Sequence, residues 1–136
     1  MATNHTELRA WVLADAVRRS VLQLIKKPRV REDLDFCSQA RRAARSACRN
    51  VCEGFYRYGH PEFANFVNIA RGSLGELLDS VQDARLEGYL TPSEGDALEE
   101  KIHHAIAVSN SLYTYLINTP TPPRKRKQWP PPKSAE

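Results

Sequence analysis

The segment Arg41-Arg42-Ala43-Ala44-Arg45-Ser46-Ala47-Cys48-Arg49-Asn50-Val51-Cys52-Glu53-Gly54-Phe55 predicts a helix with two chemically different sides. At about 100° per residue, small and apolar residues gather on one side: Cys37, Ala40, Ala44, Ala47, Cys48, Val51 and Phe55. Arg42, Arg45 and Arg49 fall within roughly 60° of one another on the opposite side. We therefore expect a helix that packs into a core with one side and can bind an anion with the other.

Apolar residues at helical spacing also predict helices before and after this segment. The clearest pattern runs from Phe63 to Ala84 and keeps its apolar residues on one side. Local signals mark the helix ends: Pro61 suits a first helical position, Gly88 suits a C-terminal cap, and Thr91-Pro92-Ser93-Glu94 is typical of a capping box. We expect helices at about residues 8–26, 33–55, 61–87 and 92–119.

Four amphipathic helices with short connections predict an all-α, antiparallel up-down-up-down four-helix bundle over residues 1–119. The first helix has a second, smaller apolar side formed by Leu8, Val12 and Leu22, which predicts burial on both sides, in the bundle or against a second copy. Six of the nine prolines follow residue 119. Residues 120–136 are therefore expected to form a disordered, basic, proline-rich tail.

The composition favours a cytoplasmic protein. No apolar run is long enough to span a membrane, and the N-terminus lacks a signal-peptide layout. The three cysteines, Cys37, Cys48 and Cys52, lie on one helix, which does not suit a disulfide framework. Metal binding by Cys48 and Cys52 with His103 or His104 is an alternative, but core packing is favoured and we expect no metal or cofactor.

The charges are unevenly distributed. Residues 1–59 contain 12 basic and 6 acidic side chains, whereas residues 60–119 contain 3 basic and 9 acidic ones. The tail adds 5 basic residues and 1 acidic residue, so it accounts for the whole net charge of +4. This polarity predicts either a polyanionic partner or head-to-tail contact between like subunits.

The middle of the chain resembles the four-helix-bundle proteins encoded in intervening sequences of bacterial 23S ribosomal RNA. The resemblance spans roughly residues 8–118 and rests on these residues: Gln39-Ala40-Arg41-Arg42-Ala43-Ala44, Ser46, Asn50-Val51-Cys52-Glu53-Gly54-Phe55, Glu62-Phe63, Phe66, Ile69-Ala70-Arg71-Gly72-Ser73-Leu74, Glu76-Leu77 and Leu86-Glu87-Gly88-Tyr89-Leu90. The chain is also similar to the accessory variability proteins of diversity-generating retroelements.

The second resemblance implies a homopentameric ring that binds nucleic acid (RNA or an RNA–DNA intermediate) and docks a reverse transcriptase. Three residues depart from the usual intervening-sequence pattern. Arg45 replaces an aliphatic residue, Cys48 replaces a frequent proline, and Arg49 replaces a small residue. The two arginines make this helix more basic and favour a role in handling nucleic acid. The alternative is a protein–protein scaffold without a nucleic-acid role.

Phosphate binding is the function that we expect for the basic side chains of the first two helices and the tail. The alternative is an ordinary solvated face with pairs between residues four apart, although the second helix provides few carboxylates. In the tail, Trp129 follows the basic run and would add stacking on single-stranded nucleic acid; a purely solubilising tail or a protein partner is the alternative. The candidate binding residues are Arg18, Arg19, Lys26, Lys27, Arg42, Arg45, Arg49, Arg124, Lys125, Arg126 and Lys127.

A second group of polar residues is expected to serve structure. Arg41 points nearer the apolar side and is expected to pair with Glu76 or Glu53, within the chain or between subunits. Asn50 and Ser73 are expected to form further polar contacts between helices or subunits, and Gly72 is expected at a close helix crossing. Neither glutamate has a histidine three residues on, so the sequence does not favour a di-metal or acid–base site and predicts no enzyme.

Overall fold

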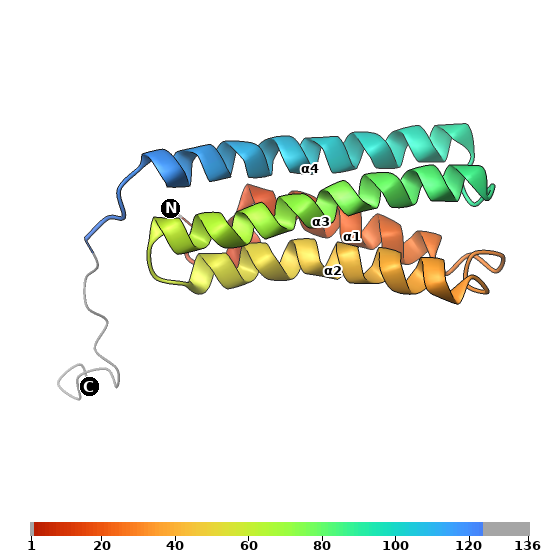
Figure 1. Cartoon of the computed structure of the whole chain (residues 1–136), viewed down its shortest axis with the longest axis horizontal. Coiled ribbons are helices and arrows are strands. Elements are labelled where there is room, and N and C mark those ends of the chain that lie inside the picture. Colours follow the sequence, from red (N-terminus) through yellow and green to blue (C-terminus); the bar gives the residue numbers. More distant parts are fainter. Residues whose placement is uncertain (1, 124–136) are drawn as a thin grey trace, which may run out of the picture.

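The computed structural model describes residues 2–123 and forms a bundle of four long helices (Figure 1). The helices are α1 (Arg9–Leu24), α2 (Leu34–Tyr56), α3 (His60–Leu86) and α4 (Pro92–Asn118), preceded by a short 3-10 helix, η1 (His5–Glu7). No strand occurs between residues 2 and 123. The all-α prediction is confirmed, and each helix end lies within one or two residues of its expected position.

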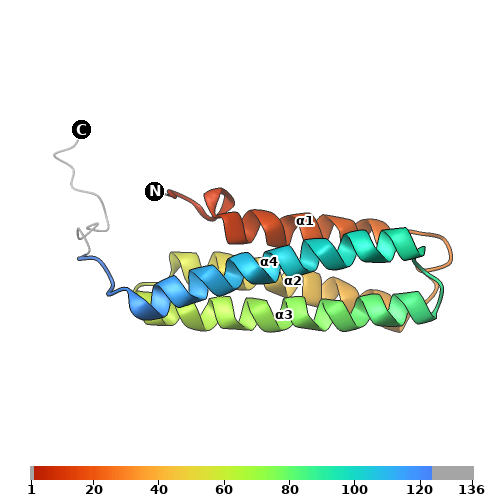
Figure 2. The ribbon, with the colours of Figure 1, turned by 90° about the horizontal axis from the view of Figure 1, so that it is seen from above.

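The helices run in alternating directions and enclose one large and two smaller clusters of buried apolar residues. α2 packs against α1 and α3, and α4 packs against the same two helices from the other side (Figure 2). The chain therefore follows an up-down-up-down path, as predicted. The first described residues and the end of α4 lie at the same end of the bundle, beside the α2–α3 connection (Figure 1).

The core consists of the apolar sides that the sequence pattern predicts. Leu74 and Leu77 of α3 and Ile102 of α4 are its largest fully buried side chains. α2 contributes mainly small residues, namely Ala40, Ala43, Ala44, Ala47 and Cys48. Because these side chains are short, α2 can lie close to its neighbours while its arginines remain outside.

The predicted C-terminal cap and capping box are present, and Asp33 adds a cap that was not predicted. The side chain of Asp33 accepts a hydrogen bond from the backbone N–H of Phe36 (3.1 Å) and caps α2. Thr91 and Glu94 form the reciprocal capping box at the start of α4. Gly88, just beyond the end of α3, has a φ of +74°, a conformation that glycine adopts without strain.

The prediction for Gly72 is wrong within the chain. Gly72 is exposed, and a Cβ built there would meet nothing within 4 Å, so no helix of residues 2–123 crosses at this position. The close approach occurs at Gly54 instead, where a Cβ would lie 2.7 Å from Phe63 Cδ1 and 2.8 Å from Phe66 Cβ. The pattern of apolar residues within α3 indicates which side is buried, but not which partner residue is nearest.

The second apolar side of α1 is only partly covered. Leu8 and Leu22 pack against buried core residues, whereas Val12 remains 46% exposed. Burial of this side against a second copy therefore stays a prediction for Val12. No helix in residues 2–123 has the length and hydropathy needed to cross a membrane.

Candidate nucleic-acid interface

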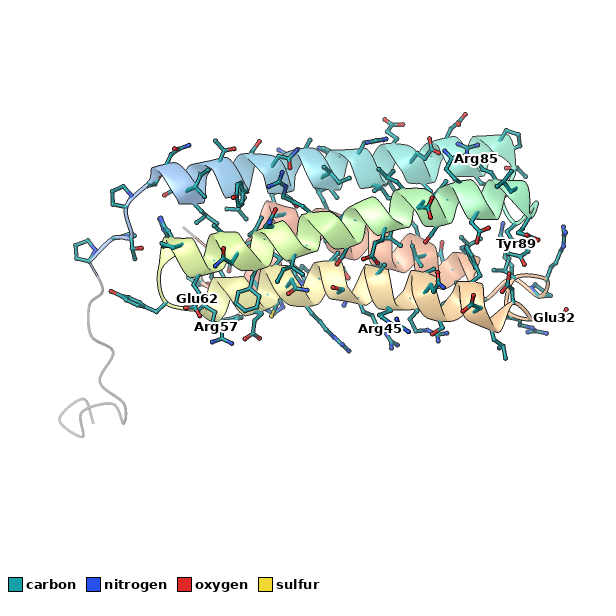
Figure 3. All side chains as sticks on the ribbon, viewed as in Figure 1. Glu32, Arg45, Arg57, Glu62, Arg85 and Tyr89 are labelled. Atoms are coloured by element: carbon teal, nitrogen blue, oxygen red, sulfur yellow. The ribbon has the colours of Figure 1, made fainter. Side chains whose placement is uncertain are left out.

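A shallow groove runs along the outer side of α2, with a volume of about 560 Å³. All its lining residues belong to α2, and we call this surface the arginine groove: Ser38, Arg41, Arg42, Arg45, Ser46, Arg49, Asn50 and Glu53. Arg42, Arg45 and Arg49 are exposed, and Arg41 is half-buried. Figure 3 shows Arg45 directed away from the other helices.

The four arginines of the groove have no carboxylate partner in the part of the chain that the structure describes. Within residues 2–123, no Asp or Glu oxygen lies within 4.0 Å of their guanidinium nitrogens. Glu53 lies in the groove, but it binds Arg57 (2.8 Å). Arg85 shows the usual arrangement, since it binds both Asp96 and Glu99. The groove is therefore a cluster of uncompensated positive charge suited to an anion with several negative groups.

A hydrogen-bonded network forms the side of the groove nearest α3. The hydroxyls of Ser46 and Ser73 lie 2.8 Å apart, and Asn50 Nδ2 donates to the Ser46 hydroxyl (3.0 Å) and carbonyl (2.8 Å). Ser73 Oγ also donates to the Ile69 carbonyl (3.2 Å). Ser73 thus makes a polar contact between α2 and α3, with Ser46 as its partner, whereas Asn50 bonds only to Ser46 within α2, and its contact with another helix or subunit stays a prediction.

The prediction that Arg41 pairs with Glu76 or Glu53 is wrong within the described chain. Neither Glu76 nor Glu53 pairs with Arg41: Glu53 binds Arg57, and Glu76 is exposed on α3 without an ion pair among the described residues. α2 turns Arg41 toward the groove rather than toward α3. Glu76 therefore takes no part in the α2–α3 polar network, and pairing of Arg41 across subunits stays a prediction.

Arg18 and Arg19 of α1 share a carboxylate partner. Asp15 lies 2.5 Å from Arg18 and 3.0 Å from Arg19, and burial alone would raise the pKa of its carboxyl. Hydrogen bonds from both guanidinium groups outweigh that effect and hold the pKa below its ordinary value. Arg19 is largely exposed, whereas Arg18 is largely enclosed and lies over the Trp11 ring (5.7 Å).

The lysines predicted for binding lie apart from the arginine groove. Lys26 is exposed at the end of α1, and Lys27 binds Glu94 of α4 (2.8 Å). Together with the Thr91 cap, that contact lowers the pKa of Glu94 to about 2. Lys27 therefore links α1 to α4, and the structure does not bring it together with Arg42, Arg45 or Arg49.

A second groove lies beside the first, with a volume of about 420 Å³. Its lining comes from η1, α1 and α2, and we call it the aromatic hollow: His5, Trp11, Arg18, Cys48, Arg49, Cys52 and Glu53. Arg49 and Glu53 line both grooves. The part played by His5 was not predicted, because helical periodicity does not reveal that η1 folds back onto α1 and α2.

The cysteines are free thiols in or near the core. Cys37 and Cys48 are buried, as expected for core residues, whereas Cys52 is half-buried in the aromatic hollow. Burial raises the pKa of Cys48 to about 11. Between residues 2 and 123, no three His, Cys, Asp or Glu side chains are grouped to hold a metal ion.

The remaining predicted binding residues, Arg124, Lys125, Arg126 and Lys127, lie outside the described residues. Contacts with His60 fix the segment after α4 as far as Thr121. The Thr121 hydroxyl accepts a hydrogen bond from the backbone N–H of His60 (2.9 Å). The Thr119 carbonyl lies 2.7 Å from His60 Nδ1. The basic run thus follows a segment attached to the start of α3.

A family model described as the 23S rRNA-intervening sequence protein matches residues 6–111. This span contains all of the arginine groove and every residue of the aromatic hollow except His5. No curated protein matches the chain. Since the match covers well over half of the 136 residues, the chain belongs to the 23S rRNA-intervening sequence protein family.

Proposed function

We propose that this protein is a non-catalytic bundle that binds RNA or an RNA–DNA intermediate by its phosphates, using the arginine groove. One observation supports this function above the others: Arg42, Arg45 and Arg49 are exposed along one helix side without carboxylate partners among residues 2–123. Arginines one turn apart can each bind a phosphate oxygen with charge-assisted hydrogen bonds. Such contacts bind the backbone and carry little sequence information.

The other predicted basic residues are expected to contribute to binding by different amounts. Arg19 and Lys26 are exposed and can add to the attraction of a polyanion. Arg18, Arg19 and Lys27 already have carboxylate partners, and Arg18 and Lys27 are also less exposed than Arg19, so these two contribute less. The run from Arg124 to Lys127 would extend the basic surface beyond the bundle.

Assembly and partners form a further part of the proposal. By its resemblance to accessory variability proteins of diversity-generating retroelements, the chain would form a cytoplasmic homopentameric ring that docks a reverse transcriptase. The separation of charge between residues 1–59 and 60–119 supports head-to-tail contact, because each subunit has a basic half and an acidic half. A ring would repeat the arginine groove and multiply its phosphate contacts.

A protein–protein scaffold is the second candidate. It is favoured by the acidic residues Glu76, Asp79 and Asp83 on α3, which are exposed and have no ion pair within the part of the chain that the structure describes. In this function the arginine groove of one subunit would bind the acidic side of α3 in the next. The charges would then serve assembly alone.

The deciding experiment measures oligonucleotide affinity against salt for two matched triple variants. Replacing Arg42, Arg45 and Arg49 with alanine should abolish most binding. The logarithm of the association constant falls as the logarithm of the salt concentration rises, and the magnitude of this slope should decrease by about 2–3. The control replaces Arg9, Arg31 and Lys101, which also removes three exposed positive charges, but from outside the groove. It should retain most of the binding.

Light scattering on the same samples separates the two candidates. Loss of binding with an unchanged subunit number supports the nucleic-acid function. If the groove variant instead falls apart into monomers while the parent protein binds no nucleic acid at any salt concentration, the scaffold function is correct.

A further inference from the structure

The aromatic hollow joins aromatic, basic and acidic groups in one recess. His5 and Trp11 contribute rings from η1 and α1, while Arg18, Arg49 and Glu53 contribute charged groups. Its volume of about 420 Å³ lies within the ~300–1,000 Å³ range of small-molecule sites. The hollow is therefore large enough for a planar group the size of a nucleobase.

The rings of the hollow are held by contacts with one another. His5 meets Trp11 edge-to-face (centroids 5.1 Å apart) and Tyr56 in the same manner (5.6 Å). The Tyr56 hydroxyl lies 3.1 Å from His5 Nδ1 and accepts a hydrogen bond from the His5 backbone N–H (3.3 Å). Arg18 lies over Trp11 and is fixed by Asp15, so these groups lose little freedom when a ligand binds.

The hollow is continuous with the proposed phosphate path. Arg49 and Glu53 line both the arginine groove and the hollow, so a strand whose phosphates follow α2 passes the opening of the hollow. Arginine donors and a carboxylate acceptor match the acceptors and amino groups on nucleobase edges. Aromatic faces stack on any base, since every base has a π-face.

We propose that the protein prefers single-stranded nucleic acid and lodges one unpaired base in the aromatic hollow. This inference rests on the proposed phosphate binding by the arginine groove. Bases in a duplex are paired and stacked inside the helix, so they cannot enter a recess on the protein surface. A duplex would meet only the arginines, whereas a single strand would meet the arginines and the rings.

The first test uses the full chain with Trp129→Phe, which leaves Trp11 as the one remaining tryptophan. A 12-nucleotide single strand and a 12-base-pair duplex are titrated at equal salt, each as RNA and as DNA. The single strand should quench Trp11 fluorescence. Its dissociation constant, with concentrations expressed per phosphate, should be about tenfold lower than that of the duplex. The RNA and DNA arms show whether the sugar matters.

Two variants test the hollow itself. His5→Ala removes one ring, and Cys52→Leu narrows the recess without adding an aromatic face. Each should weaken single-strand binding about tenfold and leave duplex binding unchanged, which matches the loss of one stacked base. His103→Ala, on the exposed side of α4, is the matched control and should change neither affinity. Thermal unfolding checks that each variant keeps its fold.

A fully abasic strand of the same length provides an independent readout. It keeps the phosphates but has no base to enter the hollow, so it should bind as weakly as the duplex and quench Trp11 little. The inference is overturned if single strand and duplex bind equally in the parent and in both variants. In that case the proposed function survives so long as the Arg42, Arg45 and Arg49 variant still loses binding; absence of binding to either substrate would overturn both.

Discussion

Gly54 of α2 lies so close to Phe63 of α3 that a Cβ at position 54 would stand 2.7 Å from Phe63 Cδ1. The Cβ of Phe66 would be 2.8 Å away on the same helix. The first atom belongs to a ring and the second to the base of a side chain, so neither can move aside without shifting α3. Glycine at this position allows the α2–α3 hairpin to close.

Gly54→Ala should therefore destabilise the bundle by about 1–3 kcal/mol, because the overpacking exceeds the gain in helix propensity. Gly72→Ala is the matched control: it also lies within a helix, but its Cβ would meet nothing within 4 Å. That variant should gain up to about 1 kcal/mol. Urea unfolding of both variants measures the two effects, and a stabilised Gly54→Ala protein would contradict the close approach.

Glu94 should make the stability of the bundle depend on acid pH. Lys27 and the capping contacts with Thr91 lower its pKa from 4.5 to about 2, so the unfolded chain binds this proton more readily than the folded chain. The stabilisation is present above pH 4.5 and is lost as the pH falls toward 2. Between these values, Glu94→Gln should unfold with a weaker pH dependence than the parent protein.

Glu100→Gln supplies the control for that measurement, because Glu100 is an exposed residue of the same helix with no ion pair among the residues described. Its stability should follow that of the parent between pH 4.5 and 2. If the free energy of unfolding depends on pH in the same way for all three proteins, the Lys27–Glu94 contact does not form in solution.

Replacing each of two buried serines with alanine should change the stability of the protein in opposite directions. Ser73 bonds to Ser46 across the α2–α3 interface, so Ser73→Ala should cost about 1 kcal/mol. Ser109 is fully buried, and its hydroxyl has no partner among residues 2–123, so Ser109→Ala should stabilise the protein by roughly 1 kcal/mol. Thermal or urea unfolding gives both values. Loss of stability in both variants would indicate a partner for Ser109 in the assembled protein.

One of the three thiols should react much faster than the others with an aromatic disulfide reagent. Cys52 is half-buried at the surface, whereas Cys37 and Cys48 are buried. With a pKa of about 11, Cys48 holds only about one part in a thousand as thiolate at pH 8. We expect one fast equivalent per chain at pH 8, and none in a Cys52→Ser variant.

The same reaction reports on the aromatic hollow. A bound single strand should slow the modification of Cys52, because this side chain lines the recess. A duplex of equal length should protect it less. Equal protection by both would place the bound nucleic acid outside the hollow.

Helix positions, helix ends and the buried side of each helix were predictable from the sequence. These properties depend on neighbours within four residues along the chain, as the Thr91–Glu94 capping box and the alanines of α2 show. The burial of Ala44 and the exposure of Arg45 on α2 follow from the same local periodicity. The exposure of the arginine groove was therefore predictable as well.

Only the tertiary structure decided which of these residues meet. Gly54 rather than Gly72 marks the close helix contact, Lys27 binds Glu94, and His5 closes a recess with Trp11. In each case the partner or neighbour depends on how separate elements lie in space. Periodicity indicates the direction of a side chain but not what stands opposite it, because the offset between packed helices is set by the whole core.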